Sequence, residues 1–160
     1  GLAAIGKLTS LKRLEVVHTN VTDAGLKHLA GLVNLQQLHV HGKETTAVAF
    51  PFLSHLRELY ELDIYDRAAS NQTCEQIAQL PKLRKLMLVT GVFDDDGVRH
   101  LAKVATLEEV TLDSSKVTDA SIEHLAKLTN LRKLQLGPAK LSESGRQRLK
   151  SLLPKATVTP

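Results

Sequence analysis

Two histidines and an aspartate are spaced so that they could share one face of a sheet. His39 and His41 are two residues apart, and Asp63 follows His39 by 24 residues. Residues two apart on a strand point to the same face, and a neighbouring strand carrying Asp63 would bring its carboxylate beside His39. These groups could ligate a divalent metal ion and leave a position open for water. Exposed imidazoles or contacts with a partner explain the same residues, so we assign no metal ligand from this spacing.

Sequence motifs for catalysis are absent. The chain contains no G-x-S-x-G, P-loop, G-x-G-x-x-G or H-E-x-x-H motif, so the common signatures of acyl transfer, phosphate binding, dinucleotide binding and zinc hydrolysis are missing. A single cysteine also excludes a disulfide within the chain. We therefore expect no enzymatic activity and no cofactor, and we expect the function to lie in binding.

The elements that must position these residues follow a repeat of 24 residues. The pattern L-x-x-L-x-x-L-x-L starts at Leu8 and recurs without insertion or deletion. The chain divides into a partial repeat, six full repeats and a C-terminal cap with a strand near 156–159: 1–7, 8–31, 32–55, 56–79, 80–103, 104–127, 128–151 and 152–160. Apolar and polar residues alternate late in the pattern, which predicts a short strand with one buried face. No repeat can bury this face alone, so the repeats must stack as a single domain.

The other half of each repeat predicts a short helix. Residues suited to an N-cap recur at one position: Thr22, Ser70, Asp94, Thr118 and Ser142. Acidic residues follow most of them, where the helix dipole favours negative charge. Pro51 falls where a helix interior is expected and removes a backbone donor, so we expect a shorter or later-starting helix there. Cys74 occupies an apolar position of the repeat, and we interpret it as a small buried hydrophobic residue.

Two segments of the repeat are nearly identical, VTDAGLKHLAGL at 21–32 and VTDASIEHLAKL at 117–128. With the leucine spacing they resemble leucine-rich repeats of the 24-residue bacterial type and are similar to those of F-box-type substrate receptors. The resemblance implies an α/β fold, a leucine-rich-repeat solenoid that forms a right-handed β-α superhelix. It implies a parallel concave sheet, short convex helices and non-catalytic binding of a protein or peptide. The family's Asn or Cys after the strand is replaced here by Thr19, Lys43, Arg67, Gly91, Ser115 and Ala139.

Side chains that point outward from successive strands should form columns, with neighbours about 4.8 Å apart. One column alternates in charge over its last four members, which favours cross-strand ion pairs: Arg13, Gln37, Glu61, Lys85, Glu109 and Lys133. The next two columns lack such pairing and predict a binding patch on the concave face: His39, His41, Asp63, Tyr65, Met87, Val89 and Asp113. Tyrosine and methionine are typical of interfaces. The alternative is an ordinary mixed surface, with the true interface elsewhere.

Charge and hydropathy limit the remaining partners. The net charge is +4, and seven basic residues stand against one acidic residue from Leu131 to Pro160. No aromatic residues accompany these charges for base stacking, which argues against a nucleic-acid partner. No segment approaches the roughly 20 apolar residues of a membrane span, and no signal peptide is recognisable, so an intracellular location is slightly favoured. An alternative function is that of a structural spacer or oligomerisation segment, which would self-associate through an open N-terminal strand edge.

Overall fold

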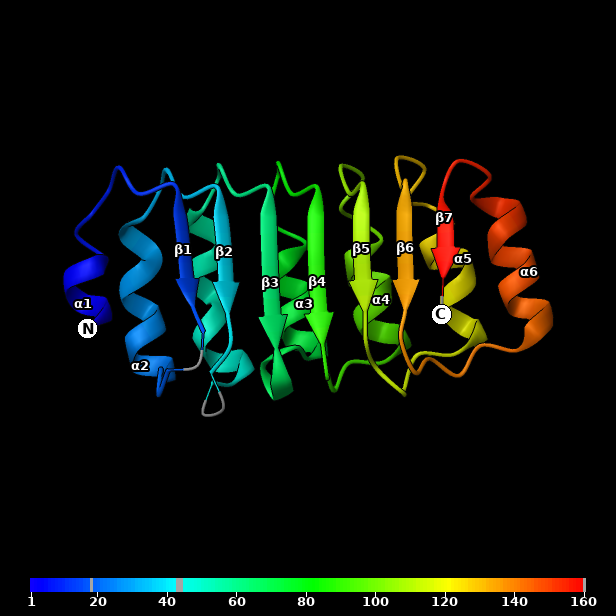
Figure 1. Cartoon of the computed structure of the whole chain (residues 1–160), viewed down its shortest axis with the longest axis horizontal. Coiled ribbons are helices and arrows are strands. Elements are labelled where there is room, and N and C mark those ends of the chain that lie inside the picture. The colour runs from blue at the N-terminus through cyan, green and yellow to red at the C-terminus, as the bar shows by residue number, and fades with distance from the viewer. Residues whose placement is uncertain (18, 43–44, 160) are drawn as a thin grey trace.

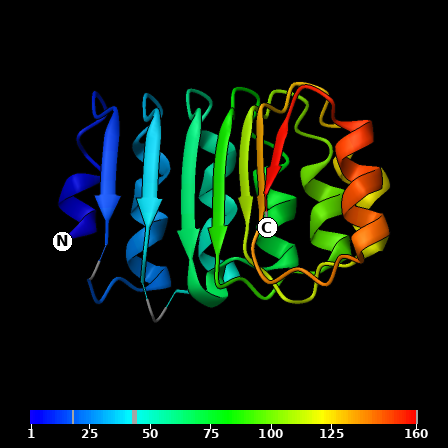
Figure 2. The same ribbon diagram turned by 45° about the vertical axis from the view of Figure 1, so that its right-hand side comes forward.

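Parallel strands lie side by side along the length of the molecule. The structure, a computed structural model, describes residues 1–17, 19–42 and 45–159. Within these residues one parallel sheet contains the strands in chain order: β1 (Arg13–Val16), β2 (Gln37–Val40), β3 (Glu61–Tyr65), β4 (Lys85–Val89), β5 (Glu109–Leu112), β6 (Lys133–Leu136) and β7 (Thr157–Thr159). The termini lie toward opposite ends of this sheet (Figure 1). Figure 2 shows the helices as a second layer behind it.

Short helices connect the strands across the back of the sheet. The α-helices are α1 (Leu2–Ile5), α2 (Asp23–Leu26), α3 (Asn71–Ile77), α4 (Asp95–Leu101), α5 (Ile122–Leu125) and α6 (Glu143–Leu152). The 3-10 helices are η1 (Lys27–Gly31), η2 (Ala47–His55), η3 (Asp66–Ala68) and η4 (Asp119–Ser121). In the described part of the chain, no helix combines the length and apolar character needed to cross a membrane.

The strand register follows the spacing of the leucines. Each strand pairs with the next so that residues 24 positions apart stand side by side, as Leu38 does with Leu62 and Leu62 with Leu86. On β3, Leu62 and Ile64 are fully buried, whereas Glu61, Asp63 and Tyr65, which alternate with them, are only partly buried. Burial of one strand face against the helices therefore builds a core that runs the length of the array.

The segment with Pro51 differs from its expected form. We expected a shorter or later-starting helix, but η2 begins directly after Thr46 and continues to His55. The whole segment winds as a 3-10 helix, and the side chain of Thr46 accepts a hydrogen bond from the backbone nitrogen of Val48. The helix with Pro51 is therefore a 3-10 helix and is not shortened, and η1, which contains no proline, has the same winding.

The predicted N-caps are largely confirmed. The side chains of Ser70, Asp94, Thr118 and Ser142 each accept a bond from the first turn of their helix. The prediction is wrong for the side chain of Thr22, which makes no cap bond at the start of α2.

Acidic residues after the caps join neighbouring repeats. The Asp95 carboxylate accepts bonds from the backbone nitrogen of Thr118 at 2.9 Å and from its hydroxyl at 2.7 Å, and it also bonds the Ser121 hydroxyl. Asp23 makes the same pair of bonds to Thr46, and Asp119 makes it to Ser142. These carboxylates therefore form a ladder between repeats in addition to neutralising helix N-termini.

Small residues allow the helices to approach closely enough for this ladder. A Cβ atom added at Gly97 would lie 2.6 Å from Oδ1 of Asn71 and 3.2 Å from Sγ of Cys74. Asn71 itself bonds Asp94 through both its side-chain amide nitrogen and its oxygen, at 2.8 and 3.0 Å. Cys74 is fully buried, as predicted, and burial raises the pKa of its thiol. Its role is therefore that of a packing residue.

The turns that follow the strands are packed by other side chains in place of the family's ladder of Asn or Cys residues. At Gly91 an added Cβ would lie 2.4 Å from the ring of Phe93, which is fully buried. The backbone oxygen of Phe93 accepts a bond from the buried Ser114 hydroxyl at 2.6 Å. Arg67 lies in η3 with its side chain exposed, and Lys43 lies outside the described residues. A missing side chain at Gly91 thus makes room for a phenyl ring.

Candidate functional site

His39 points its ring at two carboxylates on the neighbouring strand. Its Nε2 atom is 3.2 Å from Oε1 of Glu61 and 3.5 Å from Oδ2 of Asp63. Glu61 and Asp63 share a face of β3 because they are two residues apart. His39 stands directly opposite Asp63 in the register of β2 and β3. These side chains are each about one-fifth exposed, so they form a partly buried polar cluster on the outer face of the sheet.

Two further side chains hold this cluster in place. Gln37 donates a hydrogen bond to Oε2 of Glu61 at 2.7 Å, which directs the other carboxylate oxygen toward His39. On β1, Oε1 of Glu15 lies 3.8 Å from Nδ1 of His39, on the opposite side of the ring. Glu15 in turn pairs with Arg13. The orientation of His39 is therefore set by acidic groups on both neighbouring strands.

The two β3 carboxyls have opposite pKa shifts. Burial alone would raise the pKa of Glu61, but hydrogen bonds from Gln37 and His39, with the charge of Lys85, bring it below its usual value. Burial raises the pKa of Asp63, opposed by the charge of His39 and reinforced by that of Glu61. The two carboxyl groups thus repel each other, and Glu61 has the better hydrogen-bond partners.

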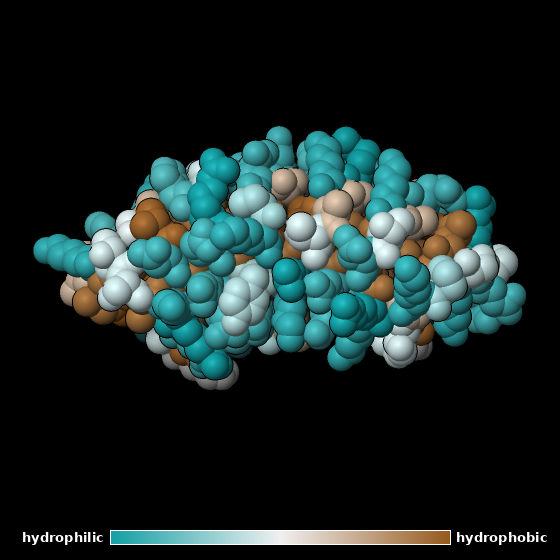
Figure 3. Space-filling model, turned by 90° about the horizontal axis from the view of Figure 1, so that it is seen from above, coloured by the Kyte–Doolittle hydropathy of each residue, from teal (hydrophilic) through white to brown (hydrophobic). Residues whose placement is uncertain are grey.

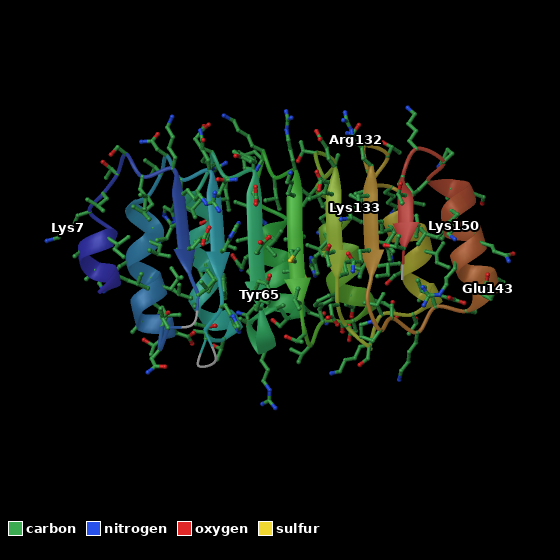
Figure 4. The ribbon with its side chains drawn as sticks, viewed as in Figure 1. Lys7, Tyr65, Arg132, Lys133, Glu143 and Lys150 are labelled. Atoms are coloured by element: carbon green, nitrogen blue, oxygen red, sulfur yellow. The ribbon has the colours of Figure 1, made fainter. Side chains whose placement is uncertain are left out.

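A second group lies beside this cluster. The rings of His41 and Tyr65 stack with centroids 5.1 Å apart and planes inclined by 30°. The Tyr65 hydroxyl donates to Sδ of Met87 at 3.3 Å, and burial followed by the charge of Asp63 raises the pKa of Tyr65. Figure 4 shows Tyr65 toward the end of β3. Three neighbouring strands thus supply one connected surface of ring, hydroxyl and thioether.

Of the other two predicted residues, Val89 lies beside these groups and Asp113 lies one strand farther along the sheet. Val89 pairs with Tyr65 in the register of β3 and β4. Asp113 follows β5, and its Cγ would lie 3.1 Å from a Cβ added at Gly137. A shallow hollow of about 180 Å³ also opens on this face, with Asp63, Met87 and Lys133 among its lining residues. We call His39, Glu61, Asp63, His41, Tyr65 and Met87 the concave cluster.

Sequence analysis missed one contact of Glu61. The charge column correctly predicted an ion pair between Lys85 and Glu109, whose atoms lie 3.2 Å apart. The Glu61 carboxylate bonds Gln37 of its own column, but its other oxygen faces His39, which belongs to the next column. Glu61 and His39 lie on adjacent strands but are offset by two residues, and long side chains can contact each other across such a diagonal. Comparing diagonal neighbours on adjacent strands, in addition to equivalent positions, would have predicted this contact.

The parallel sheet, the backing helices and the 24-residue register define the fold as an α/β leucine-rich-repeat solenoid. It is similar to internalin C2 of Listeria monocytogenes, with a TM-score of 0.78 and 21% sequence identity over 100% of this chain and 65% of that chain. It is also similar to the protein in a TLR13–ssRNA13 complex, with a TM-score of 0.58 and 22% identity over 82% of this chain and 19% of that chain. No protein-family model and no curated protein sequence matches the chain.

These structural similarities establish the fold of the chain and nothing further. The chain spans about 65% of the length of internalin C2. A second Listeria monocytogenes internalin, inlF, aligns over 99% of this chain with a TM-score of 0.50 and 16% identity.

Proposed function

We propose that the chain is a non-catalytic module that binds a protein or peptide through the concave face of its sheet. The observation that carries this proposal is the pre-formed group of His41, Tyr65 and Met87. Stacking and a hydrogen bond already hold these three side chains in place. Binding would therefore cost less side-chain ordering than at a surface of free rotamers.

The solved structures with this fold raise nucleic acid as an alternative ligand. One of them, TLR13, is in complex with a single-stranded RNA. Nucleic acid is less suited to the present chain. Arg132, Lys133 and Lys150 come from a loop, a strand and a helix, and Figure 4 shows Lys150 at α6, apart from Arg132 and Lys133 near β6. Dispersed charges of this kind do not form a continuous track for a phosphate backbone.

Replacing the three side chains should abolish binding of the partner. We expect the triple variant His41→Ala, Tyr65→Ala and Met87→Ala to fold but to lose a protein that the wild-type chain captures from a lysate of its own organism. Tyrosine truncations at interface centres commonly cost about 2 kcal/mol or more, which is over tenfold in affinity. Affinity capture with quantitative mass spectrometry measures the difference.

A matched control tests whether the effect belongs to the concave face. The variant Glu75→Ala, Gln79→Ala and Lys103→Ala removes three exposed side chains from the helical half and leaves the net charge unchanged. It should capture the partner as the wild type does, and circular dichroism should show all chains folded. Loss of capture in this control alone would place the interface on the helices and refute the proposal.

A second candidate function is self-association through the N-terminal end. A largely apolar hollow of about 380 Å³ opens there, with Leu2, Ile5 and Leu14 among its lining residues, and Leu8 nearby is 53% exposed. Figure 3 shows brown, hydrophobic atoms at this left-hand end. β1 also pairs with β2 alone in the described sheet, and an unpaired strand edge is a template for another chain.

Light scattering over a concentration series distinguishes this candidate from a monomeric binding module. Self-association through the edge predicts a mass that rises with concentration and returns to that of a monomer in Leu8→Lys. A mass of 17.5 kDa at every concentration would exclude it.

A further inference from the structure

Three ligand atoms on the concave face converge on one point. Nε2 of His39, Oε1 of Glu61 and Oδ2 of Asp63 belong to a group whose ligand atoms all lie within 4.8 Å of one another. A neutral imidazole nitrogen carries at most one proton. It can therefore donate one good hydrogen bond, although two carboxylates face it. A positive ion at the same point would be attracted to both carboxylates and to the nitrogen lone pair.

The separations match those of a tetrahedral metal site. Zn²⁺ binds imidazole nitrogen and carboxylate oxygen at roughly 2.0–2.2 Å, so two ligand atoms of a tetrahedron lie about 3.4 Å apart. The two nitrogen–oxygen distances here are 3.2 and 3.5 Å, and the two carboxylate oxygens lie within 4.8 Å of each other. The nitrogen–oxygen distances therefore already suit an ion, and the carboxylates would close around it. All three residues belong to adjacent strands of one sheet, which fixes their backbone positions.

The neighbouring residues also have the arrangement found around metal ligands. Metal-bound histidines usually present their other ring nitrogen to a carboxylate or carbonyl, and metal-bound carboxylates are themselves hydrogen-bonded. Glu15 lies on the Nδ1 side of His39, and Gln37 bonds the second oxygen of Glu61. His39 and Glu61 thus have outer partners, and the ammonium of Lys85 is paired with Glu109 while its charge also acts on Glu61.

We propose that His39, Glu61 and Asp63 form a binding site for one divalent transition-metal ion of the Zn²⁺ type. One imidazole and two carboxylates suit such an ion. Glu61 and Asp63 also line the open hollow of about 180 Å³, so the remaining coordination positions face solvent and accept water. The site concerns the chain by itself and does not depend on the proposed protein-binding function.

The test uses untagged protein, freed of metal by a chelator and titrated with Zn²⁺ in a calorimeter. We expect one ion per chain with a Kd tighter than about 0.1 mM. Co²⁺ should give a visible absorption band that Zn²⁺ removes. Asp63→Asn, which keeps the shape of the side chain, and His39→Ala should each weaken binding by at least about 100-fold, and Gln37→Ala should weaken it by about 10-fold.

His41→Ala serves as the matched control. It removes a histidine two residues from His39 on the same side of the sheet, outside the set of ligand atoms, and should leave the zinc affinity within about twofold of wild type. Circular dichroism verifies the fold of each variant. Absence of saturable Zn²⁺ binding, or binding unchanged in both Asp63→Asn and His39→Ala, would overturn the proposal. A loss in His41→Ala as large as that in His39→Ala would overturn the ligand set.

Discussion

Replacing Phe93 by alanine is expected to lower the free energy of unfolding by about 3–5 kcal/mol, the usual range for removing a buried phenyl ring. Phe93 is fully buried, and its ring occupies the space beside Gly91 that any side chain at that position would fill. The backbone around Gly91 cannot close this space by itself, so alanine should leave a cavity. Urea unfolding followed by far-ultraviolet circular dichroism measures the loss.

Two further variants show whether the cavity is the cause. Phe93→Leu keeps most of the volume and should cost less than half as much as Phe93→Ala. Val92→Ala, at a neighbouring side chain that is 41% exposed, should change stability by less than about 0.5 kcal/mol. If Phe93→Ala cost no more than Val92→Ala, the ring would not support the turn.

Replacing Asp95 by alanine is expected to destabilise the chain by about 2–4 kcal/mol, because the variant loses several bonds to one charged acceptor. The donors left behind are the backbone nitrogen and hydroxyl of Thr118 and the hydroxyl of Ser121. All three belong to the next repeat, so the loss should weaken the contact between α4 and η4. Chemical unfolding measures this change as well.

Asp96→Ala is the matched control for Asp95→Ala. The Asp96 side chain is 70% exposed and pairs with Arg99 on the surface of the same helix. Exposed pairs of this kind contribute roughly 0.5 kcal/mol or less. Equal destabilisation by the two variants would mean that the charge near the helix N-terminus matters and the inter-repeat bonds do not.

The contribution of Asp95 should also depend on pH in a defined direction. Burial would raise the pKa of Asp95, but bonds from Ser121 and Thr118 and the nearby charge of His124 bring it below its usual value. The unfolded chain, with an aspartate pKa of about 3.9, then binds the proton more readily than the folded chain. This stabilisation is present above about pH 4 and is lost as the pH falls through the folded pKa. The stability difference between wild type and Asp95→Asn should therefore shrink on acidification, and a constant difference would contradict the ladder.

Leucine spacing predicted the sheet because burial on one face of a strand has a period of two and the repeats contain no insertions. Leu38 and Leu62 stand side by side as that spacing requires. The same register correctly placed Asp63 beside His39. Interactions within one strand or between equivalent positions are thus readable from the sequence.

Interactions between positions that are not equivalent were missed. Asp95 reaches Thr118, 23 residues later, and its position had been explained by the helix dipole alone. Glu61 reaches His39 diagonally, although its column predicted an ion pair with Lys85. In both cases the decisive factor is the offset between stacked repeats, which depends on three-dimensional packing. The 3-10 winding of the helix with Pro51 was also not predicted.

The acidic ladder has a gap, and the gap lies next to the concave cluster. Ala47 holds the position that Asp23, Asn71 and Asp95 hold in other repeats, and its methyl group cannot accept a bond from Ser70. In a linear array each unit is coupled to its neighbours alone, so the missing bond should weaken the coupling at this joint by the contribution of that bond. The joint between η2 and α3 is also the joint between β2 and β3, which carry His39 and Asp63. A ligand that bridges these two strands would therefore add a connection between the repeats at the place where the ladder lacks one.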